Sequence, residues 1–459
     1  MGQQPLNSWI ETNFEGLLDE LLELVRIPSV SAQQEHRSDV LAAAQYIADY
    51  LAEAGLQTVE VMPTAGNPVV FGSHHVSDAA PTVLIYGHYD VQPPEPLEEW
   101  RTPPFEPRVE GGLITARGVS DDKAPLFIAL AVTRGFLELD GLPVNVKFLL
   151  EGEEEIGSPS LEGFLQDNAE LLKADMVLSA DGGMWLPDLP TVVNQSRGMV
   201  SLEFTLRGAR SDLHSGRHGG GIANPLHAMA QLVAGLHDKD GRVTVPGFYD
   251  GVQELSAVER EQLHNLPFSD EQYLAEVGAP EVYGEKGYST LERHWYRPTL
   301  ELNGMWGGYQ GEGSKTVLPA EAHAKITCRL VPGQEPATIA AALQEHLREL
   351  KPAGVTLELR PGKHGARAYR VPPEHPGLQL AVNVLRDVFE QEPILVGMGG
   401  TLPVSEQFQR ILGIDTVFFS FAVGDENIHA PNEFFRVERL RLGMHAWADY
   451  LARLAGAWA

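Results

Sequence analysis

The sequence predicts an α/β protein in which a mostly parallel sheet is covered by helices and a second, α+β domain is inserted. Over residues 1–198, short apolar runs alternate with stretches of helical apolar spacing, a rhythm typical of parallel sheets. After residue 198 the runs alternate apolar and polar positions, as expected for antiparallel strands with one solvated face. The alternation of short apolar runs with helical spacing returns near residue 371. We therefore expect 1–198 and 371–459 to form one domain and 199–370 to form the inserted one.

Helices and strands are predicted to alternate in the first part of the chain. Residues 82–86 form a short apolar run, as a buried strand requires, whereas 123–139 has the length and apolar spacing of a helix. By the same criteria, helices are expected at 17–26, 40–54 and 161–172, and strands at 144–150 and 174–179.

The inserted part begins with a predicted strand, 200–206, in which apolar and polar residues alternate. Further strands are expected at 299–302, 322–330 and 355–359, with helices at 225–236 and 336–350. A helix at 378–389, a strand at 416–421 and a closing amphipathic helix at 437–454 are then expected to complete the first domain.

The composition argues against several classes of protein. With 63 acidic and 34 basic residues, the net charge is −29, which repels phosphate groups and so argues against nucleic-acid and anionic membrane partners. The single cysteine, Cys328, excludes an intrachain disulfide and a cysteine-based zinc site. The longest apolar stretch, 124–132, is too short to span a bilayer, and no signal peptide is visible, so we expect a cytoplasmic protein.

Side chains that commonly bind metals follow four predicted strands of the larger domain. The carboxyl ends of parallel strands meet at one edge of a sheet, so these side chains are expected to share one crevice. Histidines and carboxylates without cysteine suit zinc or manganese, and they exceed what one tetrahedral ion needs, which indicates two metal ions. The candidates are His88 and Asp90, Glu154 and Glu155, Asp181, and His429, with Asp121 in a loop before a helix.

Each of these features alone has a simpler interpretation. The acidic run 151–155 is typical of a helix start, where carboxylates are favoured, and Asp121 with Asp122 is typical of a helix N-cap. Because all of them fall at equivalent places in the alternating pattern, a metal site explains them better. Residues i and i+2 of a strand share a face, so Asp90 is expected to hold the far ring nitrogen of His88.

Several motifs occur in order along the chain: YGHYDVQP at 86–93, Trp100 with Pro104 and Phe105, RGVSDDK at 117–123, EGEEEIGS at 151–158 and DLHSG at 212–216. Together they resemble, over nearly the whole chain, the co-catalytic zinc peptidase family. That family includes carnosinases and other cytosolic dipeptidases, aminoacylase, acetylornithine deacetylase and succinyl-diaminopimelate desuccinylase. The segments around Lys315, Arg329 and His364 are more similar to the dipeptidase branch.

The resemblance implies a metal centre with two divalent ions, zinc in the first place and manganese or cobalt as alternatives. Asp90 would be the partner that orients the ligand His88, and Glu154 would be the general base that takes a proton from the attacking water. The implied ligands are His88 and Asp181 for one ion, Glu155 and His429 for the other, and Asp121 as the bridge between them.

The resemblance also implies that the inserted domain is a lid and dimerisation domain, so we expect a homodimer. His214 would stabilise the oxyanion, reaching in from the other subunit; the alternatives are that it serves its own subunit or only fixes the turn. Arg329, as a planar bidentate donor, suits the carboxylate of the substrate. The other implied substrate-binding residues are Thr316, His364, Gly399, Gly400 and Thr401.

The activity implied is hydrolysis of the amide bond of dipeptides or short peptides. Met398 stands where many carnosinase-like members carry an acid that holds the substrate's amino group, which leaves room for N-acyl amino acids and hence for a deacylase or carbamoylase. A non-catalytic metal-binding dimer is the alternative of another class. A decayed enzyme should have lost the base or a ligand, and here all of these positions carry competent residues.

Overall fold

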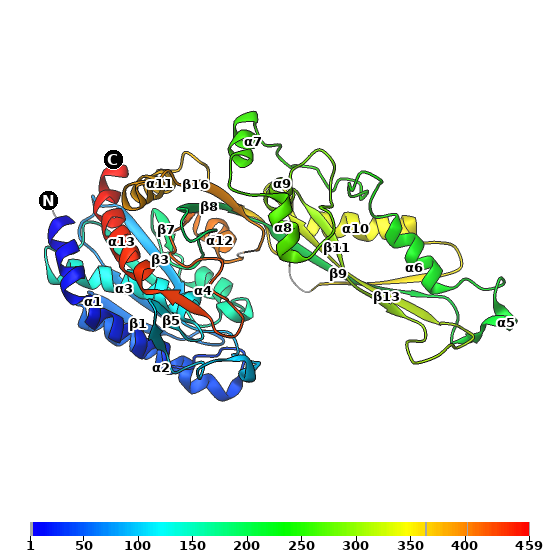
Figure 1. The fold of residues 1–459 in the computed structure, drawn as a ribbon, viewed down its shortest axis with the longest axis horizontal. Coiled ribbons are helices and arrows are strands. Elements are labelled where there is room, and N and C mark those ends of the chain that lie inside the picture. The colour runs from blue at the N-terminus through cyan, green and yellow to red at the C-terminus, as the bar shows by residue number, and fades with distance from the viewer. Residues whose placement is uncertain (1–2, 363–364, 402, 459) are drawn as a thin grey trace. The chain divides into compact units, whose positions relative to one another are not determined.

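The computed structural model describes residues 3–362, 365–401 and 403–458, and the chain forms two compact units. Unit 1 comprises Met1–Asn194, Val371–Val396 and Gln407–Ala459, and unit 2 comprises Gln195–Arg370 and Gly397–Glu406. The chain therefore leaves unit 1, builds unit 2 and returns, and a short segment near residue 400 joins unit 2 (Figure 1). Among the described residues, no helix combines the length and apolar character needed to cross a membrane.

A six-stranded sheet lies at the centre of unit 1. Its order is β1 (Thr58–Met62), β2 (Val69–His74), β6 (Asn145–Glu151), β3 (Thr82–His88), β7 (Met176–Ser179) and β17 (Thr416–Phe418). β3, β6, β7 and β17 run parallel and are almost fully buried, which is why they read as continuous apolar runs. β1 and β2 add an antiparallel edge that the sequence pattern does not predict, because β1 is exposed in part on both faces.

Helices cover the sheet of unit 1. They include α1 (Gln3–Val25), α2 (Arg37–Glu53), α3 (Ala124–Glu138), α4 (Leu161–Asp167), α11 (Pro376–Phe389) and α13 (Val437–Ala457). α3 contacts β3, α1, α2 and α13, which explains why it is apolar and buried along nearly its whole length. α4 ends five residues before the predicted limit, since the chain turns after Asp167.

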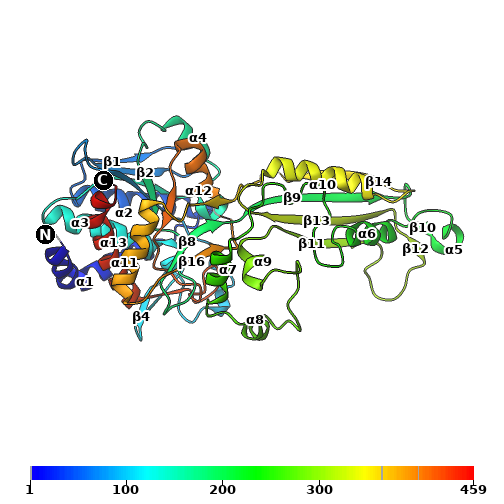
Figure 2. The ribbon, with the colours of Figure 1, turned by 90° about the horizontal axis from the view of Figure 1, so that it is seen from above.

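Unit 2 is built on an antiparallel sheet in the order β11 (Thr299–Gly307), β13 (Glu321–Leu330), β9 (Gly198–Arg207) and β14 (Thr356–Pro361). One face is apolar and packs against α6 (Pro225–Ala234) and α10 (Pro336–Leu350) (Figure 2). Cys328 belongs to this core, and burial raises the pKa of its thiol to about 12. The other face is polar, and β10 (Leu213–His214) pairs with β12 (Val317–Leu318) in a separate small sheet.

Candidate active site

The parallel strands of unit 1 bring the candidate ligands to one edge of the sheet. β3 ends at His88, and β6 ends at its register partner Glu151. β7 ends two residues before Asp181, and the loop that follows β17 carries His429. Residues from distant parts of the sequence therefore meet where the strands end.

Two groups of three candidate ligands share one aspartate. The groups are His88, Asp121 and Asp181, and Asp121, Glu155 and His429; within each, the ligand atoms all lie within 4.8 Å of one another. Oδ1 of Asp121 is 3.0 Å from Nε2 of His88, whereas Oδ2 is 2.9 Å from Nε2 of His429. Nε2 of His429 is also 3.1 Å from Oε2 of Glu155. This arrangement suits two ions with Asp121 between them.

The centre gathers more negative charge than its histidines offset. Burial, together with neighbouring carboxylates, raises the pKa of Asp181 to about 6 and the pKa of Glu154 well above its usual value. Burial acts the same way on Asp121, but hydrogen bonds from His429 and His88 outweigh it and lower the pKa of Asp121. Crowded carboxylates favour divalent cations, and this set of imidazole and carboxylate donors fits zinc, manganese or cobalt.

Asp90 is fully buried and contacts both halves of the centre. Nδ1 of His88 lies 3.0 Å from the peptide oxygen of Asp90 and 3.5 Å from its carboxylate. The carboxylate also accepts hydrogen bonds from the backbone N–H groups of Glu154 (3.2 Å) and Glu155 (3.1 Å). Asp90 thus orients a candidate ligand and fixes the loop that carries the candidate base, and the second contact has no signal in the sequence spacing.

The acidic run 151–155 divides into side chains with different partners. Glu151 is buried and accepts hydrogen bonds from two hydroxyl groups, while Glu153 is buried and accepts two backbone N–H groups. Glu155 lies beside His429, and Glu154 belongs to neither group of ligands. The run is therefore not a solvated helix start.

A buried glutamate that the motifs do not single out holds the bridging aspartate in place. Oε1 of Glu433 accepts hydrogen bonds from the backbone N–H groups of Ser120 (2.8 Å) and Asp121 (3.1 Å). Its Oε2 accepts from the N–H of Gly118 (2.8 Å) and from Nη1 of Arg117 (2.7 Å). This carboxylate therefore fixes the backbone that leads to Asp121. The available signal was the acid that closes the HAPNE run at 429–433.

The candidate substrate-binding residues of unit 2 form two groups, the first around one arginine. Arg329 on β13 is half-buried, and its Nη1 donates a hydrogen bond to Oγ1 of Thr401 (2.8 Å). Gly399 and Gly400 lie on the same loop, and their carbonyls accept hydrogen bonds from Nε and from the backbone N–H of Arg197, each of 2.9 Å. Arg197 was not predicted to act here; the signal was its place beside the start of β9.

His214 and Thr316 form the second group, because β10 and β12 place them side by side. This small sheet lies beyond the end of β13 at Glu321, whereas Arg329 is near the other end (Figure 2). At about 3.3 Å per strand residue, the stretch from Glu321 to Arg329 alone spans about 25 Å. The structure therefore does not bring His214 to Arg329 within one chain. His364 lies outside the described residues.

Comparisons with known proteins agree over most of the chain. A family model described as "Peptidase family M20/M25/M40" matches residues 84–453. The chain is 30% identical to the Cys-Gly metallodipeptidase DUG1 of Candida albicans, covering 98% of this chain and 96% of that protein. It is 26% identical to the Beta-Ala-His dipeptidase of Rattus norvegicus, and the match covers 94% of this chain and 91% of that protein. Among solved structures, the M20 family metallo-carboxypeptidase Sso-CP2 from Sulfolobus solfataricus matches with a TM-score of 0.82 at 32% identity, covering 95% and 98%.

Proposed function

Because the chain belongs to peptidase family M20/M25/M40, as its motifs predict, we propose that it hydrolyses the peptide bond of dipeptides and short peptides with two divalent metal ions. The observation that carries this proposal is the position of Asp121, which presents one carboxylate oxygen to each of two histidines. The relatives named for Cys-Gly and Beta-Ala-His as substrates support dipeptides as the substrate class.

The proposed metal ligands are the two groups that share Asp121. When bound, such ions polarise the scissile carbonyl and lower the pKa of a water molecule. The proposed holders are His88 with Asp181 for one ion, Glu155 with His429 for the other, and Asp121 for both.

Glu154 is the proposed general base. Its backbone is fixed by Asp90, and its side chain is outside both ligand groups, so its carboxylate is free to exchange a proton. Burial, then the charges of nearby carboxylates, raises its pKa and makes it a competent proton acceptor. Glu154 takes a proton from the attacking water and returns it to the leaving nitrogen.

Substrate recognition is assigned to unit 2. Arg329, held by Thr401, is the proposed partner of the substrate's C-terminal carboxylate, since a guanidinium binds a carboxylate through two parallel hydrogen bonds. Met398 leaves room for a second candidate function, the hydrolysis of N-acyl amino acids, which the dipeptidase relatives do not favour.

The active form is proposed to be a homodimer in which His214 serves the partner's site. Within one chain, His214 and Arg329 are separated by at least about 25 Å of strand, more than the length of a dipeptide. If both residues touch one substrate, they must come from different subunits.

A substrate panel with and without a chelator tests the proposed function. Cys-Gly, β-Ala-His, N-acetyl and N-carbamoyl amino acids would be incubated with the protein, and release of the free amino acid measured. We expect dipeptides to be cleaved, chelation to abolish turnover, and zinc, manganese or cobalt to restore it. Full activity of metal-free protein would contradict the two-metal site, whereas cleavage of only the acylated substrates would favour the second candidate function.

A further inference from the structure

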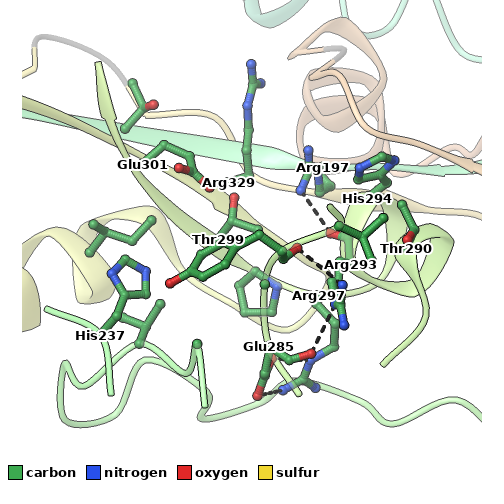
Figure 3. Close-up of a pocket in the computed structure, with 18 of the residues that line it drawn as sticks. Arg197, His237, Glu285, Thr290, Arg293, His294, Arg297, Thr299, Glu301 and Arg329 are labelled. Atoms are coloured by element: carbon green, nitrogen blue, oxygen red, sulfur yellow. Dashed lines mark hydrogen bonds and ion pairs between the residues drawn. The ribbon is translucent and has the colours of Figure 1, made fainter. Parts of the chain in front are cut away.

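A pocket of about 580 Å³ lies inside unit 2, on the polar side of its sheet. Strands β11 and β13 contribute Glu301 and Arg329, and the chain around α9 (Thr290–Trp295) contributes Arg293 (Figure 3). Arg197, which precedes β9, lines the same pocket. The pocket is therefore lined both by Arg329, which is proposed to hold a substrate carboxylate, and by Arg197.

Arg197 and Arg329 make no ion pair with a carboxylate in the part of the chain that the structure describes. Arg197 donates from Nε to the carbonyl of Gly399 (2.9 Å) and from Nη1 to the carbonyl of Arg293 (3.4 Å). Arg329 donates from Nη1 to Oγ1 of Thr401 (2.8 Å). A guanidinium carries more N–H donors than these bonds use, so both side chains retain donors for a ligand.

Another arginine of the pocket is paired with a carboxylate. Arg297 binds both carboxylate oxygens of Glu285, at 2.9 Å each. Acidic residues outnumber basic ones by 63 to 34, so carboxylate partners are abundant in this chain. Burial and then the charge of Arg329 lower the pKa of Arg197 to about 10, and Glu301 offsets this only in part. The pair at this end of the pocket is thus a local excess of positive charge.

We propose that this pocket receives the C-terminal residue of a peptide substrate and that Arg197 selects an acidic side chain, aspartate or glutamate, at that residue. The inference rests on the proposed function, in which Arg329 holds the substrate's C-terminal carboxylate. An acidic C-terminal residue carries two carboxylates, and at this end of the pocket the guanidinium groups of Arg197 and Arg329 have no acidic partner among the described residues. The long-range repulsion from the net charge of −29 is screened by salt, whereas contacts in a half-buried pocket are screened much less.

The test compares Ala-Glu with Ala-Gln, which differ in the charge of the C-terminal side chain. We expect kcat/KM for Ala-Glu to exceed that for Ala-Gln by about tenfold or more, as for a charge-assisted hydrogen bond. Arg197→Gln should bring this ratio close to one, and Arg197→Lys should leave it in between, since an ammonium lacks the planar fork of donors. The ratio is decisive because Arg197 also binds the Gly399 carbonyl, and loss of that contact affects both substrates alike.

Arg360→Gln is the matched control. Arg360 lies on β14, the opposite edge strand of the same sheet, and binds Glu358, so its loss removes the same charge away from the pocket. The ratio should not change. In the unaltered protein, L-glutamate should also inhibit Ala-Gln hydrolysis more strongly than L-glutamine does, a measurement that needs no variant.

Three results would overturn the inference and leave the proposed function intact. They are cleavage of both dipeptides by the unaltered protein at a ratio near one, an equal fall of the ratio in Arg360→Gln, and equal inhibition by the two free amino acids. Cleavage of neither dipeptide under metal-loaded conditions would remove the proposed dipeptidase function and this inference with it.

Discussion

The centre of unit 1 has an excess of negative charge, whereas one end of the pocket of unit 2 has an excess of positive charge. In unit 1, the partly buried carboxylates of Asp121, Asp181 and Glu155 outnumber the two histidines, His88 and His429, that lie among them. In unit 2, Arg197 and Arg329 lie together with no acidic partner among the described residues. By contrast, Arg117 and Glu433 are both deeply buried and form an ion pair with each other, 2.7 Å apart.

This contrast shows where the chain leaves room for a ligand. A buried or half-buried charge costs free energy unless an opposite charge or hydrogen bonds compensate it. Where the protein itself supplies the compensation, as for Arg117, the pair is structural. Where it does not, the sign of the excess supports the proposed ligands: cations at the carboxylates of unit 1, and a carboxylate at the guanidinium groups of unit 2.

The largest effect on turnover is expected for the proposed general base of unit 1, Glu154. Glu154→Gln keeps the size of the side chain but cannot take a proton, so kcat should fall by about 10²–10⁴-fold while both metal ions stay bound. Glu155→Gln removes a ligand and should lose metal. Turnover and metal content of the two variants check this. Equal metal content in both, or an active Glu154→Gln, would contradict the assignment.

In the proposed homodimer, His214 would act on the substrate bound at unit 1 of the partner subunit. His214→Ala should lower kcat by about 10²–10³-fold, as for one oxyanion donor. Co-expressed with Glu154→Ala, it should recover activity, because a mixed dimer then contains one site with both lesions and one with neither. The measurement is turnover by mixed dimers isolated with two affinity tags. If verified mixed dimers are inactive, His214 does not act across subunits.

Glu433, whose charge is paired with that of Arg117, allows a test of how the metal centre of unit 1 is held. Glu433→Gln weakens the acceptor that holds the N–H of Asp121, so metal affinity should drop by about 10–100-fold. Glu426→Gln is the control, because Glu426 is equally buried and binds Oγ of Ser120 but makes no hydrogen bond to Asp121. Calorimetric titration with zinc compares the two variants. Equal losses would make Glu433 a general stabiliser only.

Arg329 of unit 2 should bind the substrate through the planar geometry of its guanidinium group as well as through its positive charge. Arg329→Lys keeps the charge but loses the fork of donors, so kcat/KM for a dipeptide should fall by about tenfold. The C-terminal amide of the same dipeptide lacks the carboxylate and should be affected much less. An equal loss on both substrates would argue against a grip on the carboxylate.

The smallest effect concerns the stability of unit 2 in mild acid. Burial, then the charges of Arg197 and Arg293, lowers the pKa of His294, with Asp270 opposing and the ring of Tyr273 packed 5.3 Å away. The unfolded chain binds a proton at about pH 6.5 that the folded chain disfavours, so the free energy of unfolding should decrease as pH falls through that value. His294→Gln should remove this contribution in melting curves recorded between about pH 7.5 and about pH 5.5. A variant more acid-sensitive than the unaltered protein would contradict the sign.

Much of the architecture can be predicted from the sequence, because helices and strands with one consistent buried surface have regularly spaced apolar residues. α10 spans the predicted residues 336–350, and β6 lies within one residue of its prediction, since each has one consistent buried surface. The fold class is confirmed, and the predicted ligands His88 and Asp181 lie in one group because parallel strands bring their ends together.

Contacts between distant segments came only from the tertiary structure. Glu433 binds backbone N–H groups more than 300 residues away in sequence, and a backbone donor leaves no trace in the residue pattern. Packing also decides which of the 63 acidic residues lie near Arg197. That none of those the structure describes forms an ion pair with it could therefore not be predicted. The return of residues 397–406 to unit 2 has the same origin: the contacts that a loop makes, and not its composition, decide where it belongs.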